Sequence, residues 1–220
     1  MKSSFWFWFI VGFLGLTLIT IGVLSYIKTV AKNNEPTTIL KPEVIAILEQ
    51  SEKKRDQAQE LLSKKESSTD DQKQAKELLQ QSIDDAKKAT ETQPNNPQTW
   101  LFLAKIYEQL IGINPQNAVL AEEAVKKALE LQPKNPKILQ ELATVYIHQE
   151  RYREAEEILL QAIELDPTDP NYYFKLGNVY KEINRDDDAR KNYLKAKELT
   201  PDSHATNSAM IELQLRNLGN

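Results

Sequence analysis

The 220-residue chain has no cysteine and only two histidines, and each shortage excludes a class of chemistry. Without thiols there are no disulfide bonds, no thiolate zinc site, no cysteine nucleophile and no lipid-modified cysteine anchor. The histidines, His148 and His204, lie far apart with no metal-ligand spacing around them. Glycine is also scarce, and neither a glycine-rich phosphate loop nor a nucleophile motif occurs. We therefore expect no catalytic residue, no metal, no cofactor and no small-molecule substrate.

One acidic run, Asp186-Asp187-Asp188, invites comparison with a metal site. It lacks the alternating spacing and the glycine of a calcium loop. The run stands where a helix is expected to begin, where acidic residues cap the helix and interact favourably with its dipole. We therefore interpret it as a helix start.

Positive charge is limited as well. The chain has 28 Lys and Arg against 32 Asp and Glu, and three of its lysines fall within residues 1–32, which contain no acid. The rest of the chain is therefore acidic. Because nucleic-acid binding draws its affinity from clustered Lys and Arg that neutralise phosphates, we expect no nucleic-acid partner.

The one long hydrophobic run extends from Phe5 to Ile27 without a single charged residue. As a helix at about 1.5 Å per residue it would be roughly 34 Å long, enough for a hydrocarbon core of about 30 Å. The alternative is a cleaved signal peptide, whose apolar core is shorter, about 7 to 15 residues, and which needs a small-residue cleavage site. We predict that residues 1–27 form a short tail and one transmembrane helix, so that the chain is a single-pass membrane protein.

The lysines around this run bear on its orientation. Lys2 precedes it, whereas Lys28, Lys32 and Lys41 follow it. The positive-inside rule then favours, by a small margin, a cytoplasmic or stromal location for the rest of the chain. The opposite orientation, with the C-terminal region translocated, stays open.

Beyond this run, prolines and small residues recur in phase. Pro133, Pro167 and Pro201 are equally spaced, and Pro94 stands in the same motif. Small residues occur five and twelve positions before these prolines: Ala89, Ala128, Ala162 and Ala196, and Ser82, Ala121, Ala155 and Ala189. A second pattern of bulky residue, Leu, small residue and Tyr recurs upstream: Trp100-Leu103-Ala104-Tyr107, Leu139-Leu142-Ala143-Tyr146 and Tyr173-Leu176-Gly177-Tyr180. Such phase is the signature of a repeat array.

The spacing predicts two helices in each unit, with the recurring residues along their facing sides. Small side chains let the two helices approach closely, while Trp100, Tyr173, Leu159 and Tyr193 fill the remaining volume. The proline after each second helix ends it. Because one such unit cannot bury its own apolar face, stability comes from stacking neighbours. The fold class is therefore all-α, an α-solenoid of helix-turn-helix repeats preceded by one transmembrane helix.

This pattern resembles the tetratricopeptide repeat (TPR), and the resemblance covers about residues 67–203. It divides the chain into a linker at 28–41, a degenerate N-terminal helical hairpin at 42–96, and repeats at 97–135, 136–169 and 170–203. A C-terminal capping helix at 204–220 completes the array. The first repeat is longer than the others because of an insertion within the turn Ile111 to Asn117. Ile111 and Ile113 there are a secondary contact candidate, unless they fold back onto neighbouring helices.

In tetratricopeptide repeats the first helices line a concave groove that binds protein partners. The resemblance implies that the groove of this chain is lined by Leu101, Lys105, Glu108, Gln140, Thr144, Ile147, His148, Phe174, Asn178 and Lys181. Leu101 and Glu141 stand where chaperone-binding repeats carry the Lys and Asn of a carboxylate clamp. We therefore do not expect a chaperone tail as the ligand.

An N-terminal anchor followed by a few such repeats resembles assembly factors of photosystem I, and the repeat proteins attached to bacterial secretion or cytochrome c maturation machinery. The resemblance implies a scaffold in a bacterial inner membrane or thylakoid, whose partners are subunits of a membrane protein complex. A peptide-capturing receptor or co-chaperone at the membrane surface is the alternative function.

Overall fold

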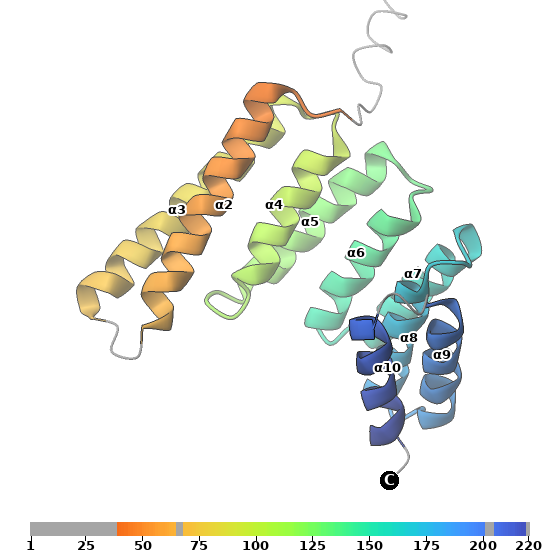
Figure 1. The fold of residues 1–220 in the computed structure, drawn as a ribbon. Coiled ribbons are helices and arrows are strands. Elements are labelled where there is room, and N and C mark those ends of the chain that lie inside the picture. The colour runs from red at the N-terminus through yellow and green to blue at the C-terminus, as the bar shows by residue number, and fades with distance from the viewer. Residues whose placement is uncertain (1–38, 65–67, 201–204, 219–220) are drawn as a thin grey trace, which may run out of the picture. The chain divides into compact units, whose positions relative to one another are not determined.

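A computed structural model describes residues 39–64, 68–200 and 205–218, which all lie within the compact unit Thr37–Asn220. The described residues form helices and no strands, as predicted for an all-helical solenoid (Figure 1). The helices are α2 (Pro42–Ser63), α3 (Thr69–Thr92), α4 (Pro97–Gln109), α5 (Gln116–Leu131), α6 (Pro136–His148), α7 (Tyr152–Leu165), α8 (Pro170–Glu182), α9 (Asp186–Leu199) and α10 (Ala205–Asn217).

The predicted membrane segment, Phe5 to Ile27, lies outside the described residues. Among the helices of residues 39–218, none combines the length and the apolar character that a bilayer crossing needs.

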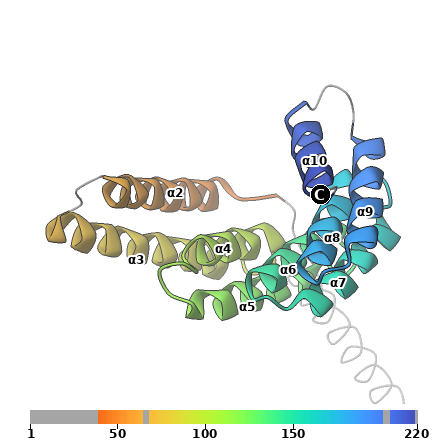
Figure 2. The same cartoon turned by 90° about the horizontal axis from the view of Figure 1, so that it is seen from below.

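The helices follow one another as antiparallel pairs, and each pair packs on the next (Figures 1 and 2). α2 pairs with α3, α4 with α5, α6 with α7 and α8 with α9, while α10 packs against α9. First helices also contact first helices, since α4 touches α6 and α6 touches α8. The residues predicted to line the groove lie on this row of first helices, α4, α6 and α8.

Two prolines frame each junction between pairs. The second helices end just before Pro94, Pro133 and Pro167, as expected from their missing N–H. A further proline, at 97, 136 and 170, is the first residue of the next helix. The side chains of Asn96, Asn135 and Asp169 cap these helices by accepting hydrogen bonds from backbone N–H groups. The proline motif therefore encodes both the end of one helix and the start of the next.

The recurring small residues lie where the paired helices cross. Ala104, Ala143 and Gly177 on the first helices are buried, as are Ala121, Ala155 and Ala189 on the second. In the N-terminal hairpin serine takes this place: Ser51 Oγ of α2 donates to the Ser82 carbonyl of α3 at 2.8 Å, and both residues are fully buried. Small residues at these positions thus allow close helix contact even in the hairpin, whose first helix lacks the pattern of bulky residue, Leu, small residue and Tyr.

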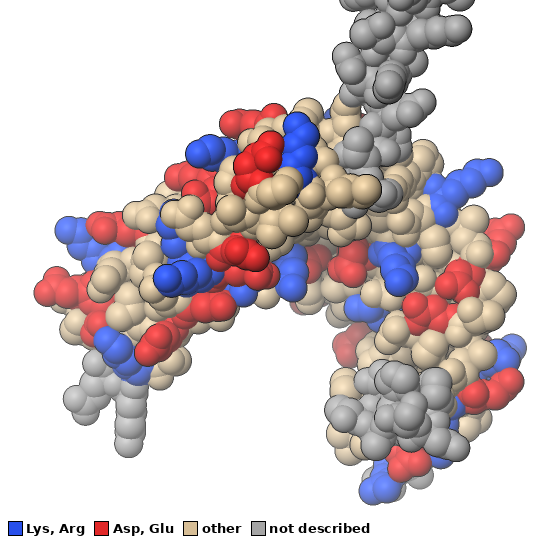
Figure 3. Space-filling model, turned by 45° about the horizontal axis from the view of Figure 1, so that its top comes forward, with Lys and Arg blue, Asp and Glu red and all other residues tan. Residues whose placement is uncertain are grey.

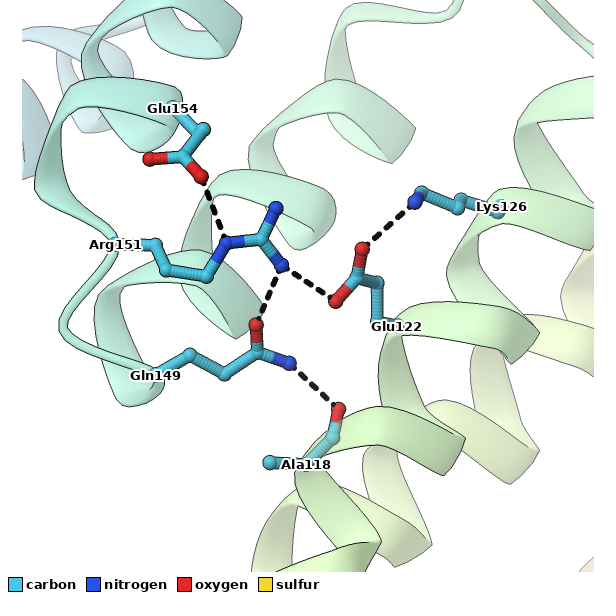
Figure 4. A network of polar contacts seen from close by, with 6 residues as sticks. All are labelled: Ala118, Glu122, Lys126, Gln149, Arg151 and Glu154. Atoms are coloured by element: carbon cyan, nitrogen blue, oxygen red, sulfur yellow. Dashed lines mark hydrogen bonds and ion pairs between the residues drawn. The ribbon is translucent and has the colours of Figure 1, made fainter.

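A polar network joins consecutive pairs (Figure 4). Arg151, just before α7, forms ion pairs with Glu122 of α5 at 2.7 Å and with Glu154 of α7 at 2.9 Å. Its guanidinium also lies over the Tyr146 ring, 4.2 Å from the ring centre. Arg185 repeats the arrangement in the next pair, with Glu156, Asp188 and the Tyr180 ring. Each arginine therefore ties the first helix of a repeat to both flanking second helices.

The turns before these arginines use a left-handed residue. Glu150 and Asn184 have φ of 58° and 57°. The N–H of the following arginine bonds back to the carbonyl of Tyr146 or Tyr180, which is the Schellman ending of a helix. This ending places Arg151 and Arg185 at the start of the second helix.

Tyr172 is a core residue that the repeat pattern did not single out. It is fully buried, together with Leu139 and Ala162, and its hydroxyl has no hydrogen-bond partner. Burial, reinforced by Asp169 and Asp166, raises the pKa of Tyr172 to about 12. The hydroxyl is thus held protonated in an apolar contact between α6, α7 and α8.

Replacing this tyrosine should stabilise the fold. We expect Tyr172→Phe to raise the free energy of unfolding by about 1 kcal/mol, because it removes an unpaired buried hydroxyl. The matched control is Tyr193→Phe, which removes a hydroxyl that bonds Asn178 Oδ1 at 2.8 Å and should lower stability by about 1 kcal/mol. Urea unfolding of the two variants measures both changes, and a destabilised Tyr172→Phe variant would contradict this account.

Candidate binding groove

The predicted groove residues share the row of first helices, but the structure divides them into three environments. Leu101, Lys105 and Glu108 line a pocket. Gln140, Thr144, Ile147 and His148 lie on the central helix, α6. Phe174, Asn178 and Lys181 lie on α8, beside the C-terminal helix.

The pocket has a volume of about 460 Å³. Leu101, Lys105 and Glu108 line it from α4, and Glu141 lines it from α6. The remaining wall comes from Leu48 of α2 and from Leu40, which precedes that helix, with Gln98, Phe102, Ala104 and Val125. The hairpin therefore closes one side of a space that the repeats alone would leave open.

Glu108 is the most perturbed acid in this pocket. Its Oε1 atom is buried and has no hydrogen-bond partner. Burial, and next the negative charge of Glu141, raise the pKa of Glu108 to about 7, against the opposing charges of Lys175 and Lys105. A carboxyl that is only partly ionised near neutral pH thus faces the pocket.

The central helix offers a mainly polar surface. Thr144 Oγ1 donates to the Gln140 carbonyl and accepts a hydrogen bond from Lys175 Nζ of α8, both at 2.9 Å. Ile147 is half-buried against the core, whereas His148 is exposed. Neighbouring groups nevertheless displace part of the water around its ring, and this desolvation, followed by the charge of Lys175, lowers the pKa of His148. Thr144 is therefore already engaged by a neighbouring repeat, while His148 remains accessible.

On α8, internal contacts occupy the predicted binding residues. The Phe174 ring lies 5.7 Å from the Tyr193 ring, and Asn178 accepts the Tyr193 hydroxyl. Lys181 Nζ donates to Gln214 Oε1 of α10 at 3.0 Å. Substitutions of Phe174 or Lys181 would therefore disturb packing as well as any partner contact, which makes them poor probes of binding.

The turn that lengthens the first repeat has one exposed isoleucine. Ile113 is 60% exposed, whereas Ile111 is half-buried. Asn117 anchors the turn by donating its side-chain N–H to the Leu110 carbonyl at 3.0 Å. Of the two candidate contact residues, only Ile113 is well presented to a partner.

The acidic run at α9 behaves as a helix start, with one correction. Asp186, Asp187 and Asp188 occupy the first turn, where the helix dipole favours them. The cap position itself, however, is Arg185, and no side chain caps the helix. Within the described ranges, no group of three or more His, Asp and Glu is placed to hold a metal ion.

Charge on the surface is mixed. Figure 3 shows acidic and basic side chains interleaved over the face that it presents. This distribution agrees with the ion pairs on exposed helix faces, such as Lys127 with Glu130 and Lys195 with Glu198.

Sequence comparison assigns the repeats. Residues 114–176 match one tetratricopeptide repeat model, and residues 170–203 match a second. This part of the chain is thus built of tetratricopeptide repeats. No significant match to a curated protein was found.

Solved structures of similar fold were also found. A crystal structure of MamA aligns with 69% of this chain and 92% of its own, at 23% identity and a TM-score of 0.49. The first TPR of Spaghetti (RPAP3), bound to the HSP90 peptide SRMEEVD, aligns with 56% of this chain and 92% of its own, at 20% identity and a TM-score of 0.46. PcrH, in complex with the chaperone binding region of PopD, aligns with 51% of this chain and 90% of its own, at 15% identity and a TM-score of 0.44.

Proposed function

We propose that this chain is a membrane-anchored scaffold that binds a protein partner in the groove of its first helices and helps to assemble or stabilise a membrane protein complex. The observation that carries the proposal is the pocket between α2, α4 and α6. Its volume of about 460 Å³ lies in the range of ligand sites, and its lining combines an apolar wall with a few charged groups. Tetratricopeptide repeats are in general interaction scaffolds rather than catalysts, and stacked repeats offer extended concave binding surfaces.

The membrane part of the proposal rests on the sequence of residues 5–27. This uncharged apolar run is long enough to span a bilayer, and the linker that follows is short. Residues 28–41, even fully stretched at about 3.5 Å per residue, would keep the repeats within roughly 50 Å of the membrane. Such tethering favours partners that are themselves membrane proteins. We place the protein in a bacterial inner membrane or a thylakoid, with the repeats on the cytoplasmic or stromal side.

The anchor gives a direct prediction. Full-length protein should stay in the membrane pellet during alkaline carbonate extraction, because a spanning helix is not released by loss of electrostatic contacts. A truncated protein that begins at Asn34 should be recovered in the soluble fraction. Release of the full-length protein by carbonate would refute the anchor.

The second candidate function is a receptor or co-chaperone that captures extended peptides, which the mixed lining of the pocket also suits. Crosslinking and affinity purification of the full-length protein from its membranes distinguishes the two. A scaffold should yield a few membrane subunits in fixed proportion, whereas a receptor should yield many unrelated clients.

A further inference from the structure

The pocket between α2, α4 and α6 joins two kinds of surface. Leu40, Leu48 and Leu101 belong to its apolar wall, and Glu108 and Glu141 add two carboxyl groups. A side chain that suits both surfaces has an apolar stem and ends in a charged group or a hydrogen-bond donor. Lysine and arginine side chains have this form, since their methylene stems pack on apolar surfaces while the cation seeks an acceptor.

Glu108 differs from two other partly buried acids, Glu122 and Asp85. Those two acids pair with Arg151 and Lys54, at 2.7 and 2.6 Å. Oε1 of Glu108 has no such partner, although it is buried. Polar atoms in this situation usually find a donor, and a carboxylate without one destabilises the protein. Oε1 of Glu108 is therefore free to accept a hydrogen bond from a donor on a bound partner.

The charged groups around Glu108 do not fill that role. Lys105, on the same helix, is exposed, and Lys175 of α8 donates to Thr144 instead. Glu141 of α6 adds negative charge, and the pocket residues Leu40 and Leu48 are apolar. An apolar occupant would bury the carboxyl without a donor, and an anionic one would meet two glutamates. Charge complementarity thus selects a cation.

We propose that this pocket binds an arginine or lysine side chain of an extended partner segment, with the stem against the leucines and the cation at Glu108 and Glu141. This inference rests on the proposed function and adds the chemistry of the partner. A guanidinium fits especially well, because its planar fork donates to carboxylates in pairs.

The test uses peptides selected on the full-length protein in mild detergent. A random dodecapeptide display library is selected at pH 8, and the best binders are measured by fluorescence polarisation. We expect them to carry arginine or lysine beside an apolar residue. Glu108→Gln plus Glu141→Gln, which keeps side-chain shape and removes charge, should weaken binding at least about tenfold. The control, Glu123→Gln plus Glu157→Gln at exposed second-helix positions, should change binding less than about twofold.

The pH dependence of binding supplies a second readout. A cation binds the ionised carboxylate, so affinity should be full above the pKa of Glu108, about 7, and should fall as pH drops through it. Between pH 8 and pH 6 we expect about a tenfold loss for the native protein and almost none for the double glutamine variant.

The outcomes separate this inference from the proposed function. Selected peptides without basic residues, or equal affinity for the glutamine variant, would overturn the cation pocket. If those peptides still lost binding to a Leu101→Ala variant, the groove function would stand. Peptides that bind this variant as tightly as the native protein, or no selected peptide at all, would contradict both.

Discussion

Gly177→Ala should destabilise this protein, although glycine to alanine changes inside helices ordinarily stabilise by up to about 1 kcal/mol. A Cβ atom at position 177 of α8 would lie 2.5 Å from Cε1 and 2.6 Å from Cδ1 of Tyr193 on α9. Tyr193 cannot move aside easily, because it is fully buried and its hydroxyl bonds Asn178. We expect a loss of about 1 kcal/mol for Gly177→Ala and about 3 kcal/mol for Gly177→Leu.

The control for this prediction is Gly112→Ala, in the turn before α5. No atom lies within 4 Å of a Cβ built there, so the change should stay within about 0.5 kcal/mol. Denaturant unfolding of the three variants gives the comparison. If Gly177→Ala were as stable as the native protein, α8 and α9 would not cross as closely as the repeat pattern requires.

The second large effect concerns binding. Leu101→Ala removes an apolar contact from the pocket. Because a few residues at the centre of an interface usually contribute most of its affinity, we expect partner binding to weaken about tenfold. Leu101 is half-buried and packs against the core, so the unfolding of this variant is measured beside its binding.

The matched control reverses two charges on second helices, Glu157→Lys and Lys191→Glu, both at exposed positions. Recovery of the partner from membranes should be unchanged in this control and lost in the groove variant. The opposite pattern would move the interface to the second helices, and loss in neither variant would direct attention to Ile113.

Periodic features of the chain were predictable from sequence. The small residues, such as Ala143 and Ala155, indicated where helices cross, because only small side chains permit that approach. The prolines indicated where helices end, because they lack an N–H. These signals are local and recur at fixed spacing, so they need no knowledge of tertiary contacts. The hairpin before the repeats was also predicted, from the in-phase Ala89 and Ser82.

The pocket, in contrast, depends on contacts that no spacing reveals. Leu40 and Leu48 line the same pocket as Leu101 only once the hairpin has folded against α4, and the sequence offers no sign of this arrangement. Glu108 and Glu141 belong to different helix positions in successive repeats, so their proximity depends on how the repeats stack. The sequence also offered no sign of the hydrogen bond between Lys181, a predicted groove residue, and Gln214 of α10.

The arginine network could have been found. Glu122 and Glu156, Arg151 and Arg185, and Glu154 and Asp188 recur at the same interval as the prolines. Glu123 and Glu157 are exposed, whereas the preceding residues, Glu122 and Glu156, form ion pairs between repeats. Acidic and basic residues that both recur at the interval of the repeat therefore indicate ion pairs between neighbouring repeats.

Site-specific photocrosslinking tests the central claim, partner binding in the groove, most directly. A benzophenone amino acid is placed at Lys105, beside the pocket, or at Glu157, on α7, in full-length protein within its own membranes. Both positions are exposed, so both tolerate the probe. The account predicts a crosslink to a distinct partner protein from position 105 and none from position 157. A crosslink from position 157 alone would contradict it.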